Sequence, residues 1–174
     1  MRIRFMMSAV FATVAVPLLY GHIRIYPLES VQGAREKYTM RVPNEKQVPC
    51  VRIEGEFPPG LESIRFEFKP GWKIEIKRDD KGRIRGAVWT GTMVADEFVE
   101  FGIQALNPKD ATTLVWKFVQ YFADGSKAEF TGPESSPSPS PVTTLKKAAA
   151  SVSGPLEIRS LAVAVRCRVS EPRA

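Results

Sequence analysis

His22 is the residue of this chain whose type and position most directly suggest chemistry, because it follows an apolar leader and is the only histidine among 174 residues. Residues 1–21 have a basic start at Arg2 and Arg4, an apolar stretch, and the small residue Gly21 just before His22. A signal peptide has this anatomy, and the stretch is short for a membrane span. We therefore expect residues 1–21 to be a cleaved signal peptide and the mature protein to be exported, either periplasmic or secreted.

A mature chain that begins with His22 carries two nitrogen donors on one residue. Near neutral pH both a free α-amine and an imidazole give up their protons readily to a metal ion. The amine nitrogen and Nδ1 then close a chelate ring, and nitrogen-rich tetragonal sites suit Cu(II) best among the first-row divalent ions. The sequence thus predicts a mono-histidine brace for Cu(II), with a carboxylate to complete the coordination and balance the charge.

Three glutamates are candidates for that carboxylate. Glu100 is the first choice, because it lies on the polar side of a predicted strand, residues 98–105, whose other face is apolar. Glu45 and Glu97 are weaker candidates. The alternative for Glu100 is a solvent-facing partner of a cross-strand lysine or arginine. The alternative for Glu45 is a hydrogen bond within its own loop.

Several other functions are excluded or disfavoured by what the chain contains. A serine or cysteine triad needs a histidine, and the only one is His22 at the expected mature terminus. A copper oxygenase is disfavoured because such sites use a second histidine, so we expect no enzyme. The net charge of +6 does not indicate nucleic-acid binding, because residues 22–144 carry 17 basic and 17 acidic side chains.

The body of the chain alternates apolar and polar residues with a period of two, which is typical of half-buried strands. Turn sequences separate these stretches at short intervals and favour an all-β fold, an antiparallel sandwich or barrel. We expect the domain to cover residues 22–144. The predicted strands are residues 23–26, 37–42, 51–56, 64–68, 72–77, 84–89, 98–105, 114–122 and 127–130.

The C-terminal part of the chain has a different composition. Residues 133–141 read PESSPSPSP, which favours an extended, polyproline-like segment. Residues 145–174 form a tail in which 156–169 alternate and would add one strand, while the Ala-rich residues 145–152 are the one stretch with some helical spacing. Cys50 and Cys167 would tie this tail to the body if they formed a disulfide, and two free thiols are an equal alternative.

A set of short motifs in a fixed order resembles the YcnI-like domain family. After His-x-x-x-x-Pro at residues 22–27 come YTMRVPNEK at 38–46, PGW at 70–72, WTG at 89–91, FVEF at 98–101, QYFADG at 120–125 and TGP at 131–133. The resemblance implies an extracytoplasmic copper-binding β-sandwich, immunoglobulin- or cupredoxin-like, with copper held by His22 and by a strand glutamate matching Glu100. It also implies a tryptophan near the metal and a role in copper acquisition or homeostasis. We expect a copper transporter or chaperone as partner.

The chain departs from the family pattern in three places. Phe130 stands where the family has a tryptophan near the end of the domain, which keeps an aromatic wall but puts a redox role in doubt. Gly91 is followed by Thr92 where a second glycine is frequent, and the tail has no membrane anchor, so we expect no membrane span in the mature chain. The remaining alternative is a metal-free structural or interaction sandwich of the cell envelope.

Overall fold

The computed structural model describes residues 21–148, and this part of the chain contains twelve strands and no helix. The all-β prediction is therefore confirmed. The strands are β1 Arg24–Tyr26, β2 Glu29–Val31, β3 Arg35–Pro43, β4 Cys50–Glu56, β5 Glu62–Phe66, β6 Lys73–Arg78, β7 Ile84–Met93, β8 Phe98–Leu106, β9 Thr113–Val115, β10 Lys117–Phe122, β11 Lys127–Phe130 and β12 Val142–Lys146.

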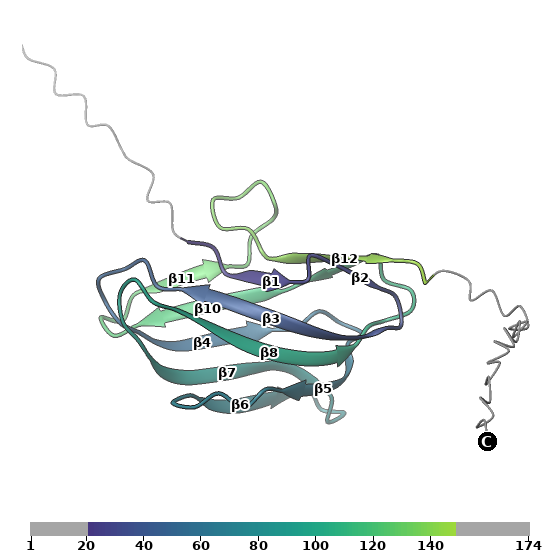
Figure 1. Ribbon diagram of the computed structural model, residues 1–174, viewed down its shortest axis with the longest axis horizontal. Coiled ribbons are helices and arrows are strands. Elements are labelled where there is room, and N and C mark those ends of the chain that lie inside the picture. The colour runs from purple at the N-terminus through teal and green to yellow at the C-terminus, as the bar shows by residue number, and fades with distance from the viewer. Residues whose placement is uncertain (1–20, 149–174) are drawn as a thin grey trace, which may run out of the picture.

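The strands form a sandwich of two larger sheets, with a small third sheet beside them (Figure 1). The first has the order β1-β3-β8-β5 and the second the order β11-β10-β4-β7-β6, and both are antiparallel throughout. The third has the order β2-β12-β9, in which β12 runs parallel to β2. Within the described residues no helix is long and apolar enough to cross a membrane.

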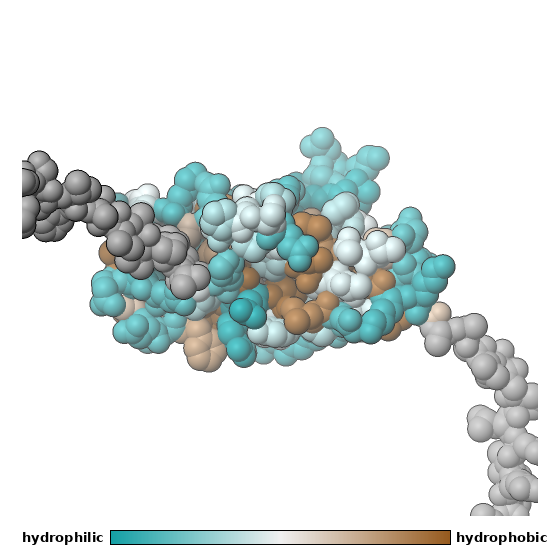
Figure 2. All heavy atoms as spheres, turned by 90° about the horizontal axis from the view of Figure 1, so that it is seen from above, coloured by the Kyte–Doolittle hydropathy of each residue, from teal (hydrophilic) through white to brown (hydrophobic). Residues whose placement is uncertain are grey.

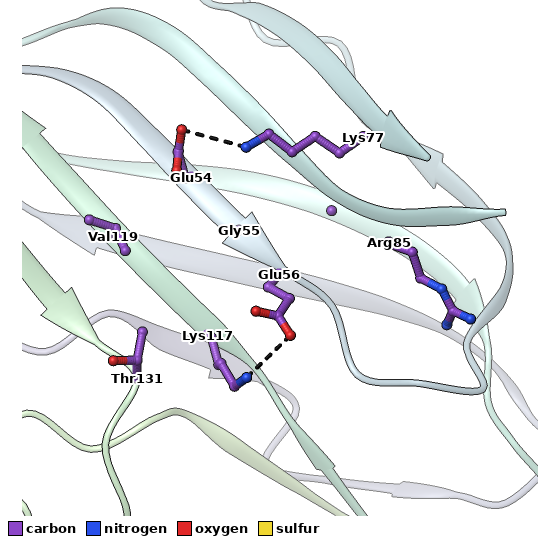
Figure 3. Close-up of a pocket in the computed structure, with 9 residues that line it drawn as sticks. Glu54, Gly55, Glu56, Lys77, Arg85, Lys117, Val119 and Thr131 are labelled. Atoms are coloured by element: carbon purple, nitrogen blue, oxygen red, sulfur yellow. Dashed lines mark hydrogen bonds and ion pairs between the residues drawn. The ribbon is translucent and has the colours of Figure 1, made fainter. Parts of the chain in front are cut away.

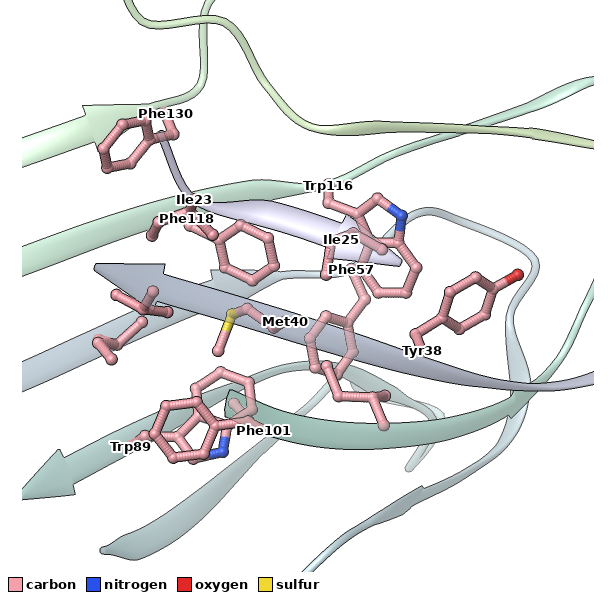
Figure 4. Packing of buried hydrophobic residues seen from close by; sticks show 14 of the residues in the cluster. Ile23, Ile25, Tyr38, Met40, Phe57, Trp89, Phe101, Trp116, Phe118 and Phe130 are labelled. Atoms are coloured by element: carbon pink, nitrogen blue, oxygen red, sulfur yellow. The ribbon is translucent and has the colours of Figure 1, made fainter. Parts of the chain in front are cut away.

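The core lies between the two larger sheets and is built by the alternation seen in the sequence. In β8, for example, Val99, Phe101, Ile103 and Ala105 are all buried, as the period of two requires. Figure 4 shows large side chains from both sheets meeting in this core, among them Trp89 of β7. The fully buried large side chains are Trp89, Trp116, Tyr38, Phe101, Phe118, Phe130, Ile23, Ile25, Met40, Ile53, Ile103 and Leu114.

The predicted strand 114–122 is divided into β9 and β10 at Trp116. The Trp116 backbone N–H donates to the carbonyl of Pro141 at 2.9 Å, and its indole N–H donates to Thr143 Oγ1 at 3.3 Å. The chain therefore leaves the β12 ladder at this residue and joins the β4 ladder. Two strands are absent from the prediction: β2 has only three residues, and β12 includes Leu145, which belongs to the stretch with some helical spacing. β12 also runs two residues past Thr144, where we expected the domain to end.

Residues 131–141 form a closed loop rather than the extended segment that the alternating Ser and Pro favour (Figure 1). Gly132 and Pro139 form an isolated β-bridge. The Gly132 N–H donates to the carbonyl of Ser138 at 3.3 Å, and the Ser140 N–H donates to the carbonyl of Gly132 at 2.9 Å. The N–H groups of Gly132 and Ser140 therefore close the loop. We call residues 131–141 the Ser-Pro loop.

Candidate metal site

The half-buried ring of His22 lies where the chain enters β1, between β11 and the Ser-Pro loop. Its centroid is 6.0 Å from that of Phe130, the last residue of β11, and the two ring planes are inclined by 59°. Its Nε2 lies 3.2 Å from the carbonyl oxygen of Pro137. The structure thus brings His22 against Phe130, the aromatic residue that the family resemblance implied.

Glu45 lies beside the residue that precedes His22. Its Oε2 accepts a hydrogen bond from the backbone N–H of Gly21. A Cβ added to Gly21 would come within 2.1 Å of Glu45 Oε1, so the carboxylate packs directly on this backbone. The contact follows from the pairing of β1 with β3, in which Arg24 faces Arg41. The chain before β1 therefore runs beside the chain after β3, where Glu45 stands.

A buried asparagine, which is not among the predicted site residues, holds the loop that carries Glu45. Asn44 is 1% exposed, and its Nδ2 donates to the carbonyls of Val48 at 3.0 Å and Met93 at 3.1 Å. Its Oδ1 accepts from the Lys46 N–H at 3.1 Å. An asparagine directly after Pro43 is a turn signal, but its partners are distant in sequence and could not be read from it.

Glu97 belongs to the turn between β7 and β8. Its carboxylate accepts a hydrogen bond from the Val94 N–H at 3.0 Å, and its carbonyl accepts from the Asn44 N–H at 2.8 Å. The carboxylate is thus used to close its own turn, while the backbone joins this turn to the loop of Glu45.

Glu100 is ion-paired across the sheet with Arg41. Its Oε1 accepts from Arg41 Nε at 2.8 Å and lies 2.7 Å from Nη2. Arg24, Arg41 and Glu100 lie in one cross-strand row, and His22 is two residues before Arg24. Two strand spacings and two residue steps separate the Cα atoms of His22 and Glu100 by about 12 Å. The cross-strand arginine considered as the alternative partner of Glu100 is therefore present.

Within residues 21–148 no group of three or more histidine, cysteine, aspartate or glutamate side chains could hold a metal ion. Near the chain entry the side chains supply one imidazole and one carboxylate, those of His22 and Glu45. Cleavage after Gly21 would add the α-amine of His22 as a third donor. Two nitrogens and one carboxylate oxygen fit the coordination chemistry of Cu(II).

Cys50 is fully buried at the start of β4, and its thiol lies 3.7 Å from the carbonyl of Arg52. Burial raises the pKa of this thiol, which keeps it protonated. Cys167 lies outside the described residues, so its pairing with Cys50 stays a prediction.

Of two hollows on the surface, one is lined by His22 and the other is not. A groove on the five-stranded sheet is lined by charged residues in ion pairs, with Glu54 3.5 Å from Lys77 and Glu56 3.2 Å from Lys117 (Figure 3). A second hollow, of about 340 Å³, has His22 in its wall together with Leu28, which is 57% exposed. Figure 2 shows hydrophobic side chains gathered in the middle of the face seen from above.

Comparison with known proteins places the chain in a family. Residues 22–150 match the domain of unknown function DUF1775. The chain belongs to this family. It is also 35% identical over 130 residues to the copper-binding protein CutI of Bacillus subtilis (strain 168). That match covers 74% of this chain and 64% of CutI, so the chain spans less than two thirds of the length of this relative. The two matches confirm the resemblance to the YcnI-like domain.

A solved structure supports the fold. The crystal structure of an uncharacterized protein from Nocardia farcinica, described as having an immunoglobulin-like fold, is 24% identical and superposes with a TM-score of 0.64. The similarity covers 71% of this chain and 97% of that protein. The predicted immunoglobulin-like sandwich is therefore confirmed.

Proposed function

We propose that this DUF1775 protein is exported and binds Cu(II) through the mature N-terminal His22, in copper acquisition or homeostasis. The observation that carries the proposal is the contact between the Glu45 carboxylate and Gly21, one residue before His22. It puts an oxygen donor beside the position where cleavage would create the α-amine. The name of CutI, a copper-binding relative, supports copper as the ion.

Cleavage after Gly21 changes the partners of Glu45. In the uncleaved chain the carboxylate accepts the Gly21 N–H. Removal of residues 1–21 takes this donor away and leaves the carboxylate near a new amine and an imidazole. A Cu(II) ion bound by all three groups would offset the negative charge of Glu45 and replace the lost hydrogen bond. Processing and metal binding are thereby coupled.

Glu45 is a better carboxylate ligand than Glu100 on two grounds. Glu45 touches the residue next to His22, whereas Glu100 lies about 12 Å from His22 between Cα atoms by strand geometry. Glu100 is also held by Arg41 through Nε and Nη2, and a ligand role would require this ion pair to break.

The site favours binding and transfer of the ion rather than catalysis. His22 is the only histidine, so a second imidazole ligand is absent from the sequence. Phe130 in the aromatic wall has no indole N–H. We expect the protein to hold copper for a transporter or chaperone.

The test is a Cu(II) titration of the chain that begins at His22, followed by EPR. We expect one equivalent to give a tetragonal signal with nitrogen coupling. A chain that keeps Gly21 at its start should give a different signal, because the α-amine then belongs to another residue and can no longer form the chelate ring of His22 alone. Glu45→Gln should weaken binding at least about tenfold, or about 1.4 kcal/mol, whereas the matched variants Glu97→Gln and Glu100→Gln should leave it unchanged.

Three results would contradict the proposal. An unchanged signal in the chain that keeps Gly21 would exclude the amine chelate. A larger effect of Glu100→Gln than of Glu45→Gln would assign the carboxylate to Glu100. No nitrogen-coupled signal at all would favour the metal-free envelope sandwich. Sequencing the exported protein from its N-terminus checks the premise, because any other first residue removes the chelate.

A further inference from the structure

The Ser-Pro loop reaches back to His22 through one backbone carbonyl. We propose that this loop is the positioning element of the site, and that the carbonyl of Pro137 holds His22 in the tautomer whose Nδ1 is free for a metal. The consequence for copper rests on the function proposed above, but the tautomer itself does not.

The chemistry follows from what each atom can do. A carbonyl oxygen only accepts hydrogen bonds, so the 3.2 Å contact between Pro137 and His22 requires the proton on Nε2. A neutral imidazole carries one ring proton, and Nδ1 therefore keeps its lone pair. Nδ1 is also the ring nitrogen that can close a chelate with the α-amine of the same residue. Metal-bound histidines generally donate their other N–H to such a partner, which fixes the ring and its tautomer.

The shape of the loop depends on Gly132. A Cβ at this position would lie 2.3 Å from Ser136 Oγ, 2.9 Å from Ser136 Cβ and 3.2 Å from the Ser138 carbonyl. Two of these three contacts are with one side chain, that of Ser136, which is adjacent to Pro137. A larger residue at position 132 must therefore displace the segment that carries the Pro137 carbonyl.

The loop is fastened to the strand that supplies the aromatic wall. Ser140 Oγ donates to the carbonyl of Phe130 at 3.5 Å, and the Ser140 N–H donates to the carbonyl of Gly132 at 2.9 Å. Phe130 is 1% exposed and belongs to the core. The ring of His22 thus meets a fixed aromatic side chain and a carbonyl whose position is set by loop closure. An Ala at position 132 would change the contact of His22 with the Pro137 carbonyl and leave its contact with Phe130.

The experiment measures the tautomer in copper-free protein. The ¹⁵N-labelled chain that begins at His22 is recorded by long-range ¹H–¹⁵N correlation at a pH where the imidazole is neutral. We expect the wild type to show the Nε2–H tautomer alone. Gly132→Ala should give the mixture of a solvent-exposed histidine, and adding Ser136→Gly should restore the single tautomer because it removes the two closest contacts. Ser135→Ala, at an exposed position of the same loop, is the matched control.

The second part of the experiment measures the Cu(II) affinity of the same proteins. Loss of an outer partner of a ligating histidine typically weakens metal binding 10- to 100-fold. Gly132→Ala should therefore lower Cu(II) affinity about tenfold, with recovery in the double variant. A wild-type ring protonated on Nδ1, or a Gly132→Ala protein that folds and keeps the wild-type tautomer and affinity, would overturn the inference. If the wild type binds no copper but shows the Nε2–H tautomer, the proposed function fails and the positioning role stands.

Discussion

Replacing Tyr38 by Phe tests whether a buried hydrogen-bond network holds the small sheet on the sandwich. Tyr38 of β3 donates through its hydroxyl to Asn107 Oδ1 at 2.6 Å, and Asn107 is 2% exposed. Asn107 Nδ2 in turn donates to Ser30 Oγ at 3.0 Å and to the Val31 carbonyl at 2.9 Å, both in β2. These hydrogen bonds therefore join three separate segments of the chain.

The magnitude follows from what Phe leaves behind. Phe keeps the ring, whose centroid lies 4.9 Å from that of Trp116, so little packing is lost. Asn107 Oδ1 would remain buried without a donor, which costs about 1–3 kcal/mol. Unfolding entropy is about 2.1 cal/mol/K per residue, or about 0.27 kcal/mol/K for residues 21–148, so Tm should fall by about 4–11 °C.

Urea and thermal unfolding followed by circular dichroism measure both quantities. Tyr121→Phe is the matched control, because its hydroxyl is 3.3 Å from Glu54 Oε2 at a half-buried position and Glu54 has other partners. The control should change the unfolding free energy by less than about 0.5 kcal/mol. A loss in Tyr38→Phe as small as that of the control would refute the reasoning.

Two further predictions concern the core. Burial raises the pKa of Cys50 above its ordinary 9.0 and that of Tyr38 above its ordinary 10.0, so the unfolded chain releases these protons first. With thiols reduced, the unfolding free energy should therefore fall as the pH rises, by about 1.4 kcal/mol per pH unit for each group. The fall begins at the group's ordinary pKa and ends at its pKa in the folded protein. Urea midpoints between pH 8 and 11 check this, and Cys50→Ala should abolish the part that starts near pH 9. Gly91→Ala should destabilise by about 1–3 kcal/mol, because its Cβ would lie 2.4 Å from Trp72 Cδ2. Trp72→Leu in the same chain should recover much of this in urea unfolding, and an undiminished loss would exclude the clash.

Most strands could be predicted because side-chain direction along a strand is a local property. The alternation in residues 98–105 assigns Val99 and Phe101 to the core with no knowledge of their neighbours. Strands whose existence depends on distant partners were missed or merged. β2 and β12 are short and pair with each other from opposite ends of the domain, and β9 is separated from β10 because it pairs with β12 whereas β10 pairs with β4.

The same distinction applies to the candidate site. The donor chemistry of His22 and the presence of an aromatic residue at Phe130 follow from residue type and order alone. The sequence placed Glu100 on a polar strand face, which is correct, but it could not say that Arg41 faces Glu100 across the sheet. That pairing, and the contact of Glu45 with Gly21, depend on the register of β1, β3 and β8.

The sequence by itself determined the all-β class, the alternation that builds the core, and a single histidine at the start of the domain. Only the tertiary structure decided which carboxylate lies at the chain entry and which ring nitrogen of His22 faces a carbonyl. The reason is physical. A residue's chemistry and its inward or outward direction are set within a few positions of the chain, whereas its neighbours are set by strand register and loop closure between segments far apart in the sequence.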